Sequence, residues 1–180
     1  NTWSRSCPVS FVTQEYHRTD VFEMQYEPRI FLHKQVLTRA KSWHDFFNAL
    51  VWMSMPKTKL AINRLHYNRQ KARGASIPRT RLENKLTHFD ECGAIILSED
   101  LNLLEMIRTH SWHELFWQSR DKLHKLKLLI VGHATYESLV NPYVGLTTKT
   151  ILVHDEGGRA SICKIDNFLA DNLERLLTES

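Results

Sequence analysis

Several widespread functional motifs are absent from this sequence. It has no GxxxxGK[ST] or GxGxxG pattern, the glycine-rich loops that hold nucleotide phosphates, and no HExxH pair of metal-binding histidines. It also lacks the GxSxG turn that presents a catalytic serine. These absences exclude a P-loop, a dinucleotide-binding motif and a zincin centre, and they argue against acyl transfer through serine.

Cysteine is scarce as well. Cys7, Cys92 and Cys163 are far apart and form no CxxC pair, which is typical of reduced thiols and argues against a disulfide framework or a zinc–cysteine cluster. No apolar run approaches the roughly 18 residues of a membrane span, and the N-terminal segment lacks the layout of a signal peptide. We therefore expect a cytoplasmic protein.

Apolar and aromatic residues are plentiful. Hydrophobic residues make up 42% of the 180 positions and include five tryptophans and eight phenylalanines, enough to build a core without disulfides or structural metals. A chain of this length favours a single domain. We predict one globular domain over residues 1–180, with a loosely ordered N-terminal segment at 1–20.

Positive charge is concentrated in one part of the chain. Residues 34–85 hold twelve lysines and arginines against two acids, a local net charge of +10, whereas the remainder has a net charge of −6. Such a basic block is typical of proteins that bind phosphate or nucleic acid. The alternative is a solvated helix face and loop.

Hydrophobic patterning predicts an α+β fold. Two central helices are expected, one from Trp43 to about Met53 and one over 57–73, with Pro56 ending the first or beginning the second. We expect a helical layer around them to pack on a small mixed β-sheet. Its strands should come from the regions of Phe89, Leu128 and Ile151.

Other segments are predicted with less regular patterns. Residues 21–35 look extended, 80–85 allow one helical turn, and 86–98 suggest two strands around a turn at 90–93. Two helices are expected over 99–110 and 111–124, a buried strand over 126–131 and a short helix over 133–140. A final hairpin of 150–154 with 160–164 and a closing helix at 165–177 complete the prediction.

The stretch from Ser42 to His66 places polar side chains in helices that otherwise look buried. His44 and Asn48 are four residues apart and so lie on one helix face, where they could orient a substrate or a water. The alternative is a pair that is satisfied inside the core. Ser42 and Asp45 have the spacing of a helix cap.

A polar stripe on the second central helix carries Lys59, Asn63 and His66. If the two helices fold against each other at Pro56, His44 and His66 could converge. Two imidazoles with a carboxylate would then suit a transition metal.

His133 and Glu137 form a second pair, four residues apart at the start of a short helix after a strand. They could chelate a metal, or the carboxylate could fix the tautomer of a working histidine. An ordinary exposed helical pair is the alternative. Asp90 and Glu91 are predicted at a turn, where acids commonly bond their own backbone. The alternative is a loop carboxylate that faces a cleft as a metal ligand or base, and Asp90 is the one included among the metal ligands.

The string WHDFFNALVW, followed by PKTK and NRLH, resembles a proteobacterial family known as domain of unknown function 3025. Further similarity lies in YEPRI at 26–30, FDECG at 89–93, and GHA at 132–134 with Glu137. The resemblance covers nearly all of the chain after residue 20. It implies a bacterial protein and brings no activity, cofactor or catalytic assignment.

We therefore consider three functions. The first is a metal- or histidine-assisted hydrolase of a phosphorylated or nucleic-acid substrate. The second is a non-catalytic nucleic-acid or ribonucleoprotein binding module that uses the basic 34–85 block. The third is a structural protein whose polar core only specifies its packing.

For the hydrolase we predict three sets of residues. The catalytic set is His44, Asn48, His66, His133 and Glu137; the substrate-binding set is Arg39, Lys57, Lys59, Asn63 and Arg64; and the ligands of a divalent metal are His44, His66, Asp90 and His133.

Overall fold

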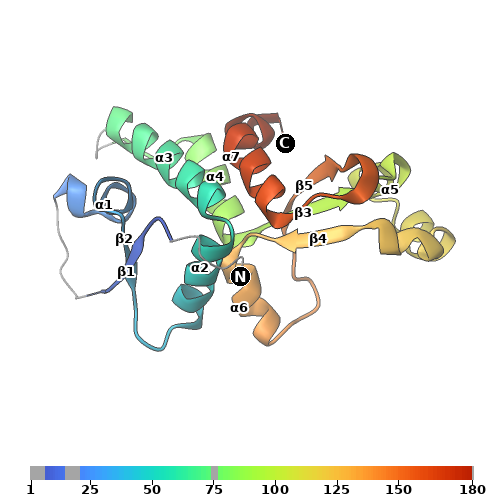
Figure 1. Cartoon of the computed structure of the whole chain (residues 1–180), viewed down its shortest axis with the longest axis horizontal. Coiled ribbons are helices and arrows are strands. Elements are labelled where there is room, and N and C mark those ends of the chain that lie inside the picture. The colour runs from blue at the N-terminus through green and yellow to red at the C-terminus, as the bar shows by residue number, and fades with distance from the viewer. Residues whose placement is uncertain (1–6, 15–20, 74–76, 180) are drawn as a thin grey trace.

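Helices and strands are interspersed along the chain in the computed structural model, with α2, α3 and α4 in succession at its centre (Figure 1). The structure describes residues 7–14, 21–73 and 77–179. The strands are β1 (Ser10–Thr13), β2 (Gln35–Thr38), β3 (Gly93–Ser98), β4 (Lys127–Ile130) and β5 (Lys149–His154). The α-helices are α1 (Tyr26–His33), α2 (Trp43–Ser54), α3 (Pro56–Arg73), α4 (Arg81–Cys92), α5 (Leu101–Arg108), α6 (His133–Val140) and α7 (Ile162–Glu179). Shorter 3₁₀ or π turns are η1 (Phe22–Met24), η2 (Glu114–Gln118), η3 (Arg120–Lys125) and η4 (Glu156–Gly158).

The larger sheet has the strand order β4-β3-β5. The central strand β3 runs antiparallel to β4 and parallel to β5, with Ile95 opposite both Leu129 and Ile151. Because β3 is covered on both faces, it consists almost entirely of apolar residues. A mixed sheet with several helices confirms the predicted α+β class.

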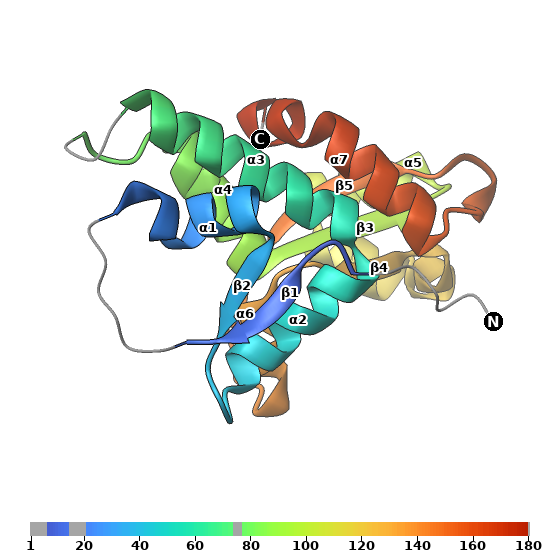
Figure 2. The same ribbon diagram turned by 60° about the vertical axis from the view of Figure 1, so that its left-hand side comes forward.

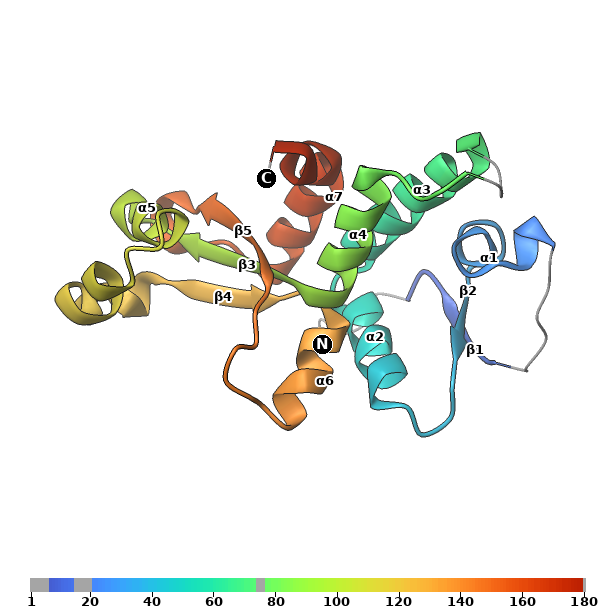
Figure 3. The ribbon, with the colours of Figure 1, turned by 180° about the vertical axis from the view of Figure 1, so that it is seen from behind.

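The main core lies between this sheet and α3, α4 and α7, which pack over it (Figures 1 and 3). The central helices α2 and α3 are confirmed. Ser42 caps α2 by accepting a hydrogen bond from the Asp45 backbone N–H at 3.2 Å, and Pro56 begins α3. A second, smaller cluster of Val9, Ile30, Val36 and Trp52 joins the parallel β1–β2 pair to α1 and α2 (Figure 2).

Two sequence predictions before the sheet were wrong. Residues 26–33 form helix α1 instead of an extended segment, because Pro28 sits in the first turn, where the missing N–H costs nothing. Residues 86–92 continue α4, which Thr80 and Glu83 start with a capping box. Leu86 and Phe89 then point from one side of this helix into the core.

Later in the chain the structure also differs from the prediction. Residues 160–164 form no strand, since α7 begins at Ile162 and β5 pairs in parallel with β3. Residues 111–124 contain a π turn and a 3₁₀ turn instead of one regular helix. Strand β4 is an edge strand with Leu128 64% exposed, so it is not buried as expected.

The predicted loose segment 1–20 lies largely outside the described residues, and its described part includes β1. The predicted break at 74–78 lies partly outside them too. Among the described helices, none combines the length and hydropathy needed to cross a membrane. The cytoplasmic location stays a prediction.

The start of α3 depends on a carboxylate from another helix. Asp166 of α7 is 1% exposed and accepts hydrogen bonds from the backbone N–H groups of Lys57 at 3.1 Å and Thr58 at 2.7 Å. Its Oδ1 also accepts from the Thr58 hydroxyl at 2.8 Å. Asp166 therefore supplies the cap that α3 lacks in its own sequence, and it joins α7 to α3.

We expect Asp166→Ala to lower the free energy of unfolding by about 3 kcal/mol, because three donors, two of them buried, lose their acceptor. Chemical denaturation measures this change. Asp171→Ala, on the exposed side of the same helix, is the matched control and should stay within about 0.5 kcal/mol of the parent. Equal losses in both variants would contradict the capping role.

Candidate functional site

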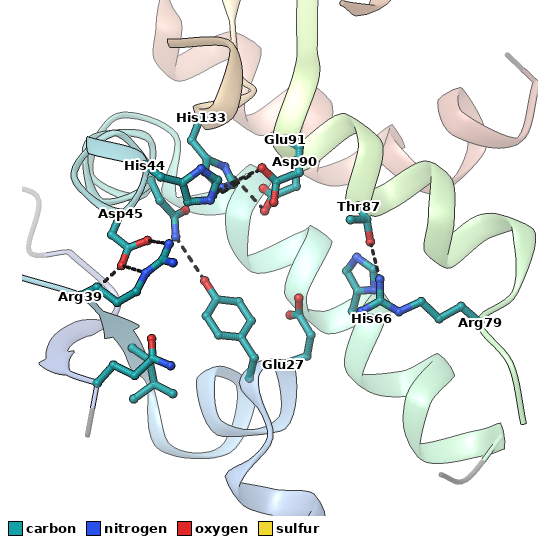
Figure 4. Close-up of a pocket in the computed structure, with 14 residues that line it drawn as sticks. Glu27, Arg39, His44, Asp45, His66, Arg79, Thr87, Asp90, Glu91 and His133 are labelled. Carbon is teal, nitrogen blue, oxygen red and sulfur yellow. Dashed lines mark hydrogen bonds and ion pairs between the residues drawn. The ribbon is translucent and has the colours of Figure 1, made fainter. Parts of the chain in front are cut away.

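Three elements bring two histidines and a carboxylate to one point (Figure 4). His44 lies in the first turn of α2, Glu91 in the last turn of α4, and His133 is the first residue of α6. The Nε2 atoms of the two imidazoles are 3.1 Å apart. Glu91 Oε2 lies 3.3 Å from Nε2 of His133 and 3.8 Å from Nε2 of His44.

A close backbone contact sets His133 beside Glu91. The N–H groups of Val131 and Gly132 both donate to the Gly93 carbonyl, at 2.9 and 2.8 Å. A Cβ atom on Gly132 would come within 2.4 Å of the Glu91 carbonyl oxygen and 2.5 Å of the Gly93 nitrogen. Only glycine therefore allows the start of α6 to lie directly on the end of α4.

Carboxylates on the far side of both imidazoles indicate their tautomers. His44 Nδ1 lies 3.1 Å from Oε2 of Glu137, and His133 Nδ1 lies 4.0 Å from Oδ2 of Asp90. The contact of His44 with Glu137 has hydrogen-bond length, so the Nδ1 atom of His44 favours the N–H form. The Nδ1 atom of His133 makes no hydrogen bond within the described residues, and the negative charge of Asp90 favours the N–H form there through electrostatics. Both Nε2 atoms then direct lone pairs toward each other and toward Glu91.

A cation placed between these atoms would be stabilised by all three electron-pair donors. Two imidazole nitrogens and a carboxylate oxygen are common zinc ligands, and bonds of about 2.0 to 2.1 Å place tetrahedral ligand atoms about 3.3 Å apart. The three distances of 3.1, 3.3 and 3.8 Å bracket that value. Within the part of the chain that the structure describes, His44, Glu91 and His133 form the one group able to hold a metal in this way.

The protonation of His133 suits a metal ligand. His133 is 3% exposed. This burial lowers the pKa of its imidazole to about 4, although the negative charge of Asp90 acts in the opposite direction. His133 is therefore neutral at physiological pH. Burial raises the pKa of Glu91, and His44 counteracts that effect.

The three groups lie in a polar cleft of about 250 Å³. Its walls come from α1, α2, α3, α4 and α6 and from the segments beside them. The further lining residues are Gln14, Tyr26, Glu27, Leu37, Arg39, Asp45, Asn48, His66, Arg79, Thr87 and Asp90. The metal-ligating atoms are thus accessible to a small molecule.

A lysine beneath the cleft neutralises Asp90. Lys59 is 3% exposed, and its ammonium donates to Asp90 Oδ1 at 2.6 Å while lying 5.4 Å from the centre of the Trp52 ring. Burial by itself would raise the pKa of Asp90, but Lys59 and His133 hold it below the ordinary range. Asp90 is therefore an anion that is already paired with Lys59. It lies beside the group of His44, Glu91 and His133 and is not one of its three members.

Glu27 has the opposite environment. It lies in the first turn of α1, and its Oε2 accepts a hydrogen bond from Asn63 at 2.7 Å. Burial raises the pKa of this carboxyl to about 7, and the negative charge of Asp90 adds to the increase. Glu27 can therefore gain or lose a proton near neutral pH.

The structure brings some of the predicted catalytic residues together. His44, Asn48, His66 and His133 all line the cleft, whereas Glu137 bonds to His44 and not to His133. Asn48 donates to the Tyr26 hydroxyl at 3.2 Å, across the two helices. Burial lowers the pKa of His66, and this imidazole is not part of the three-membered group.

The predicted substrate-binding residues are dispersed. Arg39 lines the cleft and is held by Asp45 through two contacts of 3.0 and 2.8 Å, which lowers the pKa of Asp45. Asn63 binds Glu27, and Lys59 binds Asp90. Lys57 and Arg64 instead line a separate groove between α3 and α7.

Sequence reasoning missed Glu91 and Glu27 as site residues. Glu91 was assigned to a turn, but it lies on α4, where the capping box and the buried Leu86 and Phe89 could have signalled a helix reaching Cys92. Glu27 stood in a segment predicted to be extended. Its only signal was its place within the YEPRI match, which carries no chemistry.

A family model matches residues 9–179, and the family is described as protein of unknown function (DUF3025). The match spans nearly the whole sequence, so the chain belongs to this family, and the predicted family is confirmed. No curated protein and no solved structure matches the chain.

We expect Lys59→Met to lower the free energy of unfolding by about 3 to 5 kcal/mol, because Asp90 is left without its counter-charge. Denaturation at pH 7 measures the loss. Arg64→Met, on the exposed side of α3, is the control and should change stability by less than about 0.5 kcal/mol. A loss in Lys59→Met no larger than that of the control would refute the buried pair.

The Lys59–Asp90 pair also predicts the direction in which folding stability changes with pH. Since the folded pKa of Asp90 is depressed, its contribution to stability is present above the ordinary aspartate pKa and is lost as the pH falls through the lower, folded value. The parent and Lys59→Met should therefore converge in stability on acidification. A gap that stays constant down to pH 2 would contradict this assignment.

Proposed function

We propose that this protein is a metal-dependent hydrolase of small phosphorylated substrates. The observation that carries the proposal is the convergence of three electron-pair donors, His44, Glu91 and His133, at the wall of an open cleft. A carboxylate behind His44, at 3.1 Å, adds the second shell that histidine ligands of metals usually have.

Three protein ligands leave one coordination position for a water or a substrate oxygen. A divalent metal in such a site lowers the pKa of a bound water and polarises a phosphoryl oxygen. These two effects are the requirements of phosphate ester hydrolysis, and they need no activated serine or cysteine.

Two arginines of the cleft support a phosphorylated substrate. Arg39 and Arg79 both line it, and the Arg39 side chain remains 53% exposed although Asp45 holds its guanidinium in place. A guanidinium fixed in this way is suited to bind phosphate oxygens. The volume of about 250 Å³ accommodates a small molecule or one nucleotide end.

The nucleic-acid binding module is less well supported. It relied on the basic block over 34–85, but several cations of that block are paired with acids, two of them inside the block and two outside it. These pairs are Arg39–Asp45, Lys59–Asp90, Arg69–Glu174 and Arg73–Glu83. We therefore base the proposal on the cleft and not on the block.

Metal binding is the first test. We expect the purified protein to bind one equivalent of Zn²⁺ or Mn²⁺ by calorimetry and elemental analysis. Glu137→Gln should weaken binding by about 10- to 100-fold, and His44→Ala or Glu91→Gln should weaken it further. His88→Ala is the control, since His88 is exposed on α4, the helix that carries Glu91.

An alternative without metal makes a different prediction. His44 could instead be an imidazolium between Glu91 and Glu137. In that case the parent would bind no metal above the level of the His44→Ala variant, and the proposal would fail. Because His44 and Glu91 are partly exposed at the cleft wall, both variants should keep a cooperative thermal transition, which a purely structural role would not allow.

Activity is the second test. The metal-loaded protein should hydrolyse p-nitrophenyl phosphate, lose this activity with a chelator and regain it when metal is restored. His44→Ala and Glu91→Gln should fall to the background rate, whereas His88→Ala should equal the parent. Oxygen consumption with Fe²⁺ in place of hydrolysis would reject the hydrolase, since the same donor set serves iron oxygenases.

A further inference from the structure

Glu27 is the acid of the cleft that the metal group does not use. It lies in the first turn of α1, on the opposite side of the cleft from α4 and α6. Figure 4 shows its side chain between two groups of cleft residues, Arg39 with Asp45 and His66 with Arg79. No ion pair of Glu27 with a lysine or arginine is seen in the described residues.

One neighbour holds the carboxyl group in place. The amide of Asn63 donates both to the Glu27 backbone carbonyl at 2.9 Å and to its Oε2 at 2.7 Å. Asn63 is 2% exposed in α3, so this anchor is rigid. With Oε2 accepting from the amide, Oε1 is the oxygen available to hold a proton.

We infer that Glu27 is the general acid of this cleft and protonates the leaving oxygen of a phosphate ester. The inference rests on the proposed hydrolase and deepens it, because it names the class of substrate. An enzyme with such an acid is built for esters of alcohols, whose alkoxide leaves poorly without a proton. Sugar or nucleoside phosphates belong to that class.

The charges around Glu27 favour its protonated form. Asp90 on α4 faces it with a negative charge, while the Asn63 hydrogen bond, Lys59 on α3 and Arg79 before α4 lower its pKa. Burial is the largest influence, and together these groups give Glu27 a pKa of about 7. Its neighbour Tyr26 has a pKa raised by burial and stays neutral. About half of the Glu27 carboxyls are therefore protonated at pH 7.

An acid role fits better than a base role. A divalent metal bound at His44, Glu91 and His133 would itself assist deprotonation of an attacking water, and Glu91 and Glu137 lie on that side of the cleft. The oxygen of this water forms a bond to phosphorus as the bond between phosphorus and the ester oxygen breaks. The departing oxygen takes the proton of Glu27. The proton lost by the attacking water is released to solvent, and Glu27 takes up a proton from solvent before the next turnover.

Two phosphate esters with different leaving groups test the inference. The nitrophenolate of p-nitrophenyl phosphate leaves without a proton, whereas phenyl phosphate and glycerol phosphate gain from one. We expect Glu27→Gln to lower kcat for phenyl and glycerol phosphate by about 100-fold or more, and to change p-nitrophenyl phosphate hydrolysis by less than threefold. Glu23→Gln, an exposed acid four residues earlier, is the matched control.

The pH profile gives an independent measurement. In the parent, kcat for phenyl phosphate should decline as the pH rises through about 7, because Glu27 loses the proton it must donate. This alkaline limb should disappear in Glu27→Gln. Metal stoichiometry and the thermal transition of the variant should remain those of the parent.

The other outcomes decide against the inference. Equal losses with both kinds of ester would make Glu27 a positioning group, and no loss with either would remove it from the reaction. A protein that binds metal but hydrolyses none of the esters would reject the hydrolase and this inference together. A Glu27→Gln variant with reduced metal binding would show that Glu27 supports the metal group instead.

Discussion

The contact between Gly132 and the end of α4 is the constraint on which the cleft depends. It brings the backbone of residues 91–93 against the start of α6, and this contact places His133 beside Glu91. The end of α4 and the start of α6 are each attached to one of two paired strands, because β3 follows α4 directly and β4 precedes α6. The hydrophobic sheet therefore positions the polar groups, and packing in the core determines the geometry of the site.

Part of this arrangement could be predicted from the sequence. The cap at Ser42 and the apolar character of the following helix fixed the place of His44, and the strand–glycine–histidine order of 126–133 fixed that of His133. Neither signal depends on distant residues. The two histidines were accordingly identified as site residues, although their partner was not.

The rest depended on information that local patterns do not contain. Glu91 was not selected as a site residue because Asp90 and Gly93 suggested a turn. In the structure, the buried side chains of Leu86 and Phe89 stabilise a helix that extends to Cys92. Burial against α7 and the sheet decided the matter, as tertiary contacts commonly override local propensity. Pairing of Glu137 with His44 likewise needs α2 and α6 to be adjacent, which no spacing within the chain reveals.

For residues 34–85, the net charge counted along the sequence also differs from the charge found on any one face of the protein. A net charge of +10 over 34–85 suggested one anion-binding face, but a helix distributes its side chains around its axis. Lys59 points under the cleft to Asp90, while Lys57, two residues earlier, bonds to Asn167 on α7. Counting charges along a sequence therefore overstates the field at any one place on the surface.

The carboxyl groups of the cleft differ because their neighbours differ. Asp90 has an ammonium at 2.6 Å and remains an anion, whereas Glu27 has only a neutral amide and retains a proton near pH 7. Neighbouring acids whose pKa values are driven apart in this way can hold a fixed charge and deliver a proton at the same pH. This division between a charged acid and one that can carry a proton near neutrality agrees with the chemistry proposed from the convergence of His44, Glu91 and His133.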